Sequence, residues 1–136
     1  MPSDRLDVFR AIPLFSGLSD DAIARIVDLA AEAEVPAGQV LIEPGREGSG
    51  LFVIEEGSVL VEKGDKTVEL GPGEFVGELA LLVPDAPRSA RVQAKTQVRL
   101  LAISRQHFAK LLEEEPKLAL SMLHELAARL VHTAGL

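Results

Sequence analysis

Between residues 34 and 103 the chain repeats one pattern, a short run of valine, leucine and isoleucine that ends in a glycine, a proline or a polar turn. Runs of this length and composition are typical of β-strands, and their regular spacing is typical of an antiparallel sandwich or jelly roll. The tetrapeptide Lys63-Gly64-Asp65-Lys66 separates two alternating runs, as the turn of a tight hairpin does. The predicted strands occupy residues 40–42, 51–54, 59–61, 67–70, 90–92 and 98–103.

Helical patterns flank this β-rich region. Residues 4–11 predict a short helix that ends before Pro13, and Ser19 predicts the N-cap of a second helix that extends to about Ala33. After the last strand, Ser104 predicts the N-cap of a third helix, and Pro116 separates it from a final helix that ends near Thr133.

We therefore predict a single domain that is mainly β with flanking α. In this division residues 1–33 form the N-terminal helices, residues 34–103 an antiparallel β-roll and residues 104–136 the two C-terminal helices. A chain of 136 residues is long enough to bury its own core.

Charge and composition exclude several classes of function. The formal net charge of −7 and the lack of clustered Lys and Arg argue against a nucleic-acid partner. The absence of cysteine excludes disulfides and thiolate chemistry. No signal peptide and no membrane-spanning run is recognised, so we expect a cytoplasmic protein without a membrane partner.

The segment 71–92 carries the candidate site. Gly77 precedes Glu78-Leu79-Ala80, whose helix-forming residues predict a single helical turn with free N–H groups that suit a phosphate. Pro87 then delivers Arg88, whose guanidinium can bond two oxygens of the same phosphate. The carboxylate of Glu78 would be repelled there unless the ligand also offers hydroxyl donors, as a ribose does.

Gly77-Glu78-Leu79-Ala80 and Pro87-Arg88-Ser89-Ala90, with Val92, resemble the phosphate-binding cassette of the cyclic nucleotide-binding domains. This family includes bacterial catabolite activator proteins, the regulatory subunits of cyclic-AMP-dependent kinase and cyclic-nucleotide-gated channels. The segment 12–19 is similar to the one with which these domains open, so the resemblance covers nearly the whole chain. It implies an eight-strand roll with a short phosphate-binding helix inside segment 71–92.

The resemblance also implies roles for single residues. Glu78 would accept a bond from the ribose 2′-hydroxyl, while Arg88 and the N–H groups of Leu79 and Ala80 would hold the cyclic phosphate. Ser89 would assist at the phosphate or the base edge. Since threonine at this position is common in relatives that prefer cyclic GMP, serine favours cyclic AMP, with cyclic GMP as the other candidate ligand.

The final helix offers two candidate contacts for the purine. In catabolite activator proteins a Thr-Ser pair contributed across a dimer reads adenine, and this chain has Thr133 followed by Ala134, so it keeps only the threonine. Arg129 could instead bind the purine, as an arginine does in channel domains. The alternative for Arg129 is a surface ion pair with Glu125.

Catalytic residues and metal ligands are not predicted. A jelly roll could also be a metal-binding cupin, but the three histidines, His107, His124 and His132, lie on the predicted C-terminal helices. We therefore expect no metal, no cofactor and no enzymatic activity.

The expected function is a stand-alone sensor of cyclic AMP, or of cyclic GMP. It would relay ligand occupancy to an unidentified protein partner through its final helix, whose wide apolar surface also leaves a homodimer open. The alternative is a scaffold that keeps the shape of the family, no longer binds nucleotide and acts as a protein-interaction domain.

Overall fold

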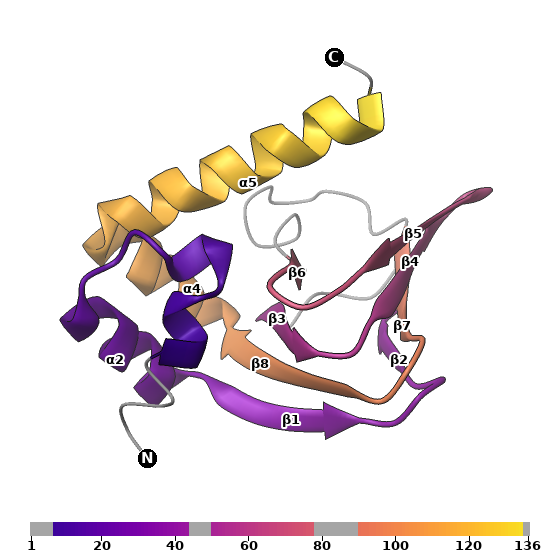
Figure 1. Cartoon of the computed structure of the whole chain (residues 1–136), viewed down its shortest axis with the longest axis horizontal. Helices are drawn as coiled ribbons and strands as arrows, with labels where there is room; N and C mark the ends of the chain where they lie inside the picture. Colours follow the sequence, from indigo (N-terminus) through magenta and orange to yellow (C-terminus); the bar gives the residue numbers. More distant parts are fainter. Residues whose placement is uncertain (1–6, 44–49, 78–89, 135–136) are drawn as a thin grey trace.

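The computed structural model describes residues 7–43, 50–77 and 90–134, with side chains up to residue 132. Within these residues the chain forms two antiparallel four-stranded sheets flanked by helices (Figure 1). The strands are β1 (Ala31–Val35), β2 (Val40–Ile42), β3 (Gly50–Glu56), β4 (Val59–Lys63), β5 (Lys66–Leu70), β6 (Phe75–Val76), β7 (Ala90–Ala94) and β8 (Val98–Ser104). The predicted mainly β roll with flanking helices is confirmed.

The two sheets are built from strands that are far apart in the sequence. The first sheet has the order β1-β8-β3-β6 and the second has the order β2-β7-β4-β5. The predicted hairpin is confirmed, since β4 and β5 pair in register up to Lys63 and Lys66. Because β6 lies at the edge of the first sheet and β7 lies inside the second, residues 78–89 connect one sheet to the other.

Alternating side chains on β3 and β8 serve two separate cores. Leu51, Val53, Leu101 and Ile103 pack against the helices. Ile54, Val98 and Leu100, on the opposite face, pack against residues of the second sheet such as Val59 and Val92. The first sheet is therefore covered on both faces, which explains why its two central strands are almost continuously apolar.

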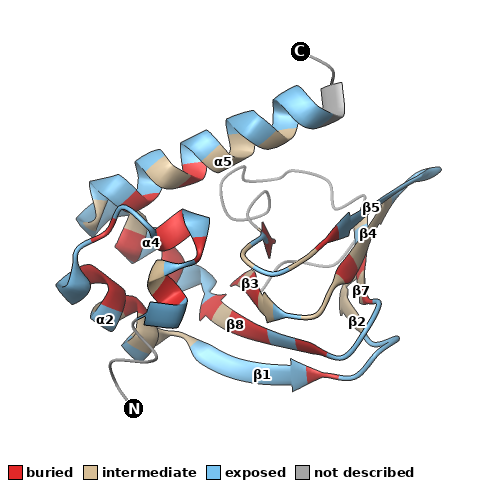
Figure 2. Cartoon of the chain, in the orientation of Figure 1, coloured by how far each residue is buried: buried red, intermediate tan, exposed pale blue. Residues whose placement is uncertain are grey.

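The helices gather on one face of the first sheet (Figures 1 and 2). Residues 7–10 are helical and are followed by a 3₁₀ turn, η1 (Pro13–Phe15). The longer helices are α2 (Asp20–Leu29), α4 (Arg105–Glu114) and α5 (Pro116–Ala134). Both predicted N-caps are confirmed: the N–H of Ala22 donates to Ser19 Oγ, and the N–H of His107 donates to Ser104 Oγ, each at 3.2 Å.

The predicted end of the second helix, at about Ala33, was wrong. Helix α2 ends at Leu29, and residues 31–35 form β1, paired with β8. Arg99 on β8 donates to Glu34 Oε1 on β1 at 3.2 Å, and this hydrogen bond raises the pKa of the Arg99 guanidinium. Pairing with β8 thus outweighs the helix propensity of alanine and glutamate in this segment.

In the part of the chain that the structure describes, no helix is long and apolar enough to cross a membrane.

Candidate functional site

Gly77 marks the point where the described part of the roll leads into the candidate cassette. It follows β6 directly and has a φ of 96°, a conformation that residues with a Cβ rarely adopt. A Cβ added here would clash with the carbonyl oxygen of Gly50 at the start of β3. The backbone conformation and the packing against Gly50 therefore both require glycine at this position.

The predicted phosphate and ribose contacts lie outside the described residues. Glu78, Leu79, Ala80, Arg88 and Ser89 all belong to segment 78–89, as does the predicted one-turn helix. Thr133 is within α5, but its side chain is not among those described. The predicted site residues that can be compared directly are therefore Gly77 and Arg129.

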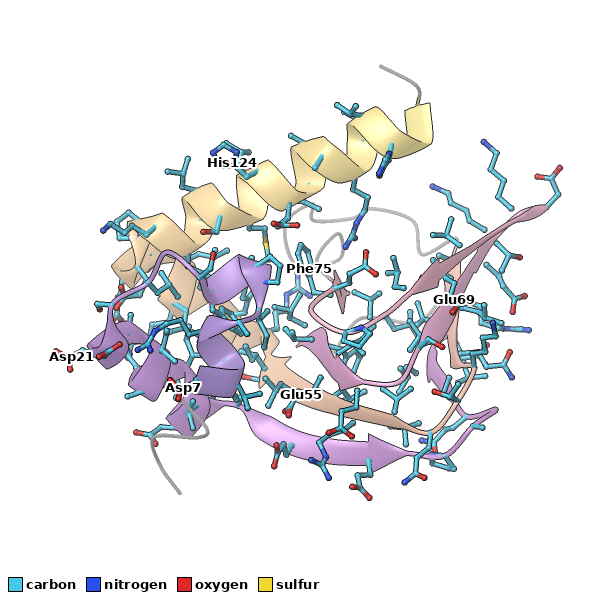
Figure 3. The ribbon with its side chains drawn as sticks, viewed as in Figure 1. Asp7, Asp21, Glu55, Glu69, Phe75 and His124 are labelled. Atoms are coloured by element: carbon cyan, nitrogen blue, oxygen red, sulfur yellow. The ribbon has the colours of Figure 1, made fainter. Side chains whose placement is uncertain are left out.

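Arg129 contacts the strand that leads to Gly77. Its Nη2 donates to the carbonyl oxygen of Phe75 at 2.9 Å, and its guanidinium carbon lies 4.7 Å from the centre of the Phe75 ring. Figure 3 shows Phe75 between β6 and α5. The structure thus brings Arg129 of α5 to the edge of the first sheet, two residues ahead of Gly77. Because Arg129 is half-buried and contacts Phe75, a surface ion pair with Glu125 alone does not account for its position.

Val61 and Val68 form an apolar wall on the second sheet, which was not predicted as part of the site. Val59 on β4 is opposite Leu70 on β5, and both are buried between the sheets. Two residues further along the same face, Val61 is opposite Val68, and Val68 remains 43% exposed. The inward face of the hairpin therefore offers accessible apolar surface.

This apolar wall lies close to the start of β7. Val61 is also opposite Val92 on β7, which begins at Ala90. The alternation of Val68 and Leu70 in the sequence could have revealed that both point inward. Only the structure reveals that Val68 is uncovered.

Segment 78–89 thus joins β6 of the first sheet to β7 of the second. Helix α5 contributes the cation Arg129 at β6, and the second sheet contributes the apolar wall of Val61 and Val68. Such an arrangement can hold an anionic ligand that has a flat apolar part. A model of the cyclic nucleotide-binding domain matches residues 32–115. The chain belongs to the cyclic nucleotide-binding domain family.

Relatives of this cyclic nucleotide-binding domain occur in larger proteins. A cyclic nucleotide-gated potassium channel of Rhizobium etli is 43% identical over 109 residues, which is 80% of this chain and 30% of the channel. A cAMP-dependent protein kinase regulatory subunit of Aspergillus fumigatus is 40% identical over 107 residues, 74% of this chain and 25% of the subunit. The chain thus spans less than a third of the length of these curated relatives.

A solved structure confirms the fold of the cyclic nucleotide-binding domain. The catabolite activator protein of Thermus thermophilus superposes with a TM-score of 0.77 at 29% identity, covering 90% of this chain and 60% of that one. Domains of this family are regulatory rather than catalytic. Among the described residues, no group of three or more His, Asp or Glu side chains could hold a metal ion.

Proposed function

We propose that this domain binds a cyclic nucleotide through segment 71–92. Glu78 accepts a bond from the ribose 2′-hydroxyl, Arg88 and the N–H groups of Leu79 and Ala80 hold the cyclic phosphate, and Ser89 assists at the phosphate or the base edge. The observation that carries the proposal is the position of Arg129, which reaches from α5 to Phe75 on β6, within that segment and two residues before Gly77. An arginine guanidinium can stack on a purine or bond its edge.

Ser89 is the basis of the proposed ligand preference, and the apolar wall of Val61 and Val68 is the proposed contact surface for the base. We propose cyclic AMP as the preferred ligand, because serine rather than threonine follows Arg88. The adenine ring would lie between the apolar wall and α5, with Arg129 and Thr133 as the contacts from the helix. Cyclic GMP is the competing ligand.

The test is calorimetric titration of the purified protein, stripped of carried-over nucleotide, with cyclic AMP and separately with cyclic GMP. We expect dissociation constants of about micromolar or tighter, with cyclic AMP the tighter ligand. A tighter cyclic GMP complex would reverse the preference and keep the binding function. No heat and no thermal stabilisation with either nucleotide would contradict nucleotide binding and favour the alternative, a protein-interaction scaffold.

Signalling from this domain would pass through α5. Leu120, Leu123, Ala127 and Leu130 are exposed on its outward side and follow the alternating spacing of three and four residues that is typical of a coiled coil. His124, on the same side, points away from the roll (Figure 3). Because this pattern is complementary to itself, we propose that a second copy of the chain covers it.

Light scattering after size-exclusion chromatography tests the homodimer. We expect a dimer that Leu123→Lys converts to a monomer with cyclic AMP binding retained, since Leu123 lies outside the proposed pocket. A wild-type protein that stays monomeric at every concentration would overturn the homodimer. It would leave a different protein as the partner of α5.

A further inference from the structure

Among the residues that the structure describes, β6 pairs only with β3, and Arg129 meets β6 on its other side. The carbonyl oxygen of Glu74 accepts a bond from the N–H of Ile54 on β3 at 2.9 Å. Successive carbonyls of a strand point in opposite directions, so the carbonyl of Phe75 points away from β3, toward the open edge of the sheet. Arg129 donates to this oxygen and covers the Phe75 ring, which is 1% exposed.

The two halves of α5 are held to the rest of the molecule in different ways. Leu118 and Met122 are buried in the core beneath the helices, and Leu126 packs against that core. Among the residues that follow, from 127 to 132, Arg129 alone is half-buried and the others are exposed (Figure 2). A helix segment with so few buried contacts has low local stability, and the loss of one contact can release it.

We propose that Arg129 and Phe75 form a latch that fixes the second half of α5 to the edge of the roll. The latch joins α5 to the backbone two residues before Gly77, where the cassette begins. A displacement of β6 on ligand binding would then be passed to α5 through this pair. As part of the latch, Arg129 positions the helix, and it is also a candidate purine contact. The role of the latch in signalling rests on the proposed function.

The latch itself is tested without ligand by hydrogen exchange measured by mass spectrometry. Arg129→Met keeps the length and the helix propensity of the side chain but removes its charge and its donors. We expect amide exchange in residues 127–132 to become about tenfold faster, the effect of losing one charged hydrogen bond, with residues 118–122 unchanged. Lys117→Met, an exposed cation on the same helix, is the control and should change neither region.

Unchanged exchange in Arg129→Met would overturn the latch. Phe75→Leu provides a second readout, because it removes the ring and keeps the carbonyl. Its effect on residues 127–132 should be smaller than that of Arg129→Met, and the two changes combined should be less than additive. Additive effects would mean that the two residues act on α5 independently, which also contradicts the latch.

The signalling role is tested by repeating the exchange experiment with cyclic AMP at saturating concentration. In the wild type, ligand should change exchange both near Gly77 and in residues 127–132. In Phe75→Leu, which keeps Arg129 as a purine contact, the change near Gly77 should persist and the change in α5 should be reduced. A change in α5 as large in this variant as in the wild type would overturn coupling through the latch. A wild type that binds no cyclic nucleotide would refute the proposed function, while the ligand-free experiment would still decide the latch.

Discussion

At the scale of single residues, Gly77 is the described residue on which the site depends most directly. We predict that Gly77→Ala lowers the free energy of unfolding by about 1–3 kcal/mol through backbone strain alone, because alanine must adopt a positive φ. The clash with the Gly50 carbonyl adds to this loss. Denaturant unfolding with urea measures the change.

Gly17 provides the matched control for this substitution. No atom lies within 4 Å of a Cβ added at Gly17, and its φ is not in the positive range. Gly17→Ala should therefore change the free energy of unfolding by no more than about 0.5 kcal/mol. Equal losses in the two variants would contradict the special role of the backbone at Gly77.

Glu78 is predicted to contact the ribose rather than to stabilise the fold. Glu78→Ala should weaken cyclic AMP binding by about 1–3 kcal/mol, because a hydroxyl bond is lost. The affinity of 2′-deoxy cyclic AMP, which lacks this hydroxyl, should be the same in the variant and the wild type. Calorimetric titration compares the two ligands. A variant that fails to fold would instead assign Glu78 a structural role.

At the scale of secondary-structure elements, α5 has one face that belongs to the core and one that does not. Leu118 is 1% exposed, whereas Leu123 on the same helix is 66% exposed. Leu118→Ala should lower the free energy of unfolding by about 2–5 kcal/mol, the usual loss for a buried leucine. Leu123→Ala should change it by no more than about 0.5 kcal/mol in a monomer.

Thermal and urea unfolding at several protein concentrations distinguish these effects. If a second copy covers α5, Leu123→Ala should also lose stability, and the loss should depend on protein concentration. A large loss of stability in Leu123→Ala that does not depend on protein concentration would mean that Leu123 is buried in the monomer. It would contradict the outward orientation of this face of α5.

The elements that the sequence predicted correctly have strong local patterns. The strands with valine- and leucine-rich runs and both N-capped helices are confirmed, because turn residues and capping hydroxyls act within a few residues. β1 was missed because Ala-Glu-Ala-Glu also suits a helix and becomes a strand only by pairing with β8. β6 was missed because two residues, Phe75 and Val76, carry no periodicity.

The candidate site was predictable only in part, because only some of its residues are close together in the sequence. The spacing of Gly77, Glu78, Arg88 and Ser89 is a local motif that can be read from the sequence. The contact between Arg129 and Phe75 joins residues 54 positions apart, and it depends on how α5 crosses β6. The uncovered face of Val68 depends in turn on where the second sheet ends, which no local pattern records.

At the scale of the whole molecule, segment 78–89 joins the edge strand of the first sheet to an inner strand of the second. The cassette leaves the first sheet after β6 and enters the second at β7, while α5 reaches the edge strand through Arg129. A chain with a net charge of −7 does not attract a small anion at long range, so the local donors must provide the binding. Arg88 is the strongest of the predicted donors.

The cyclic AMP affinity of Arg88→Ala, measured beside that of the wild type by calorimetric titration, tests nucleotide binding through segment 71–92 most directly. We predict that the variant remains folded and binds about 2–5 kcal/mol more weakly, because the cyclic phosphate loses its charged partner. Lys117→Ala, which removes an exposed cation at the start of α5, should bind as the wild type does. A folded Arg88→Ala variant with unchanged affinity would contradict the assignment of the phosphate site.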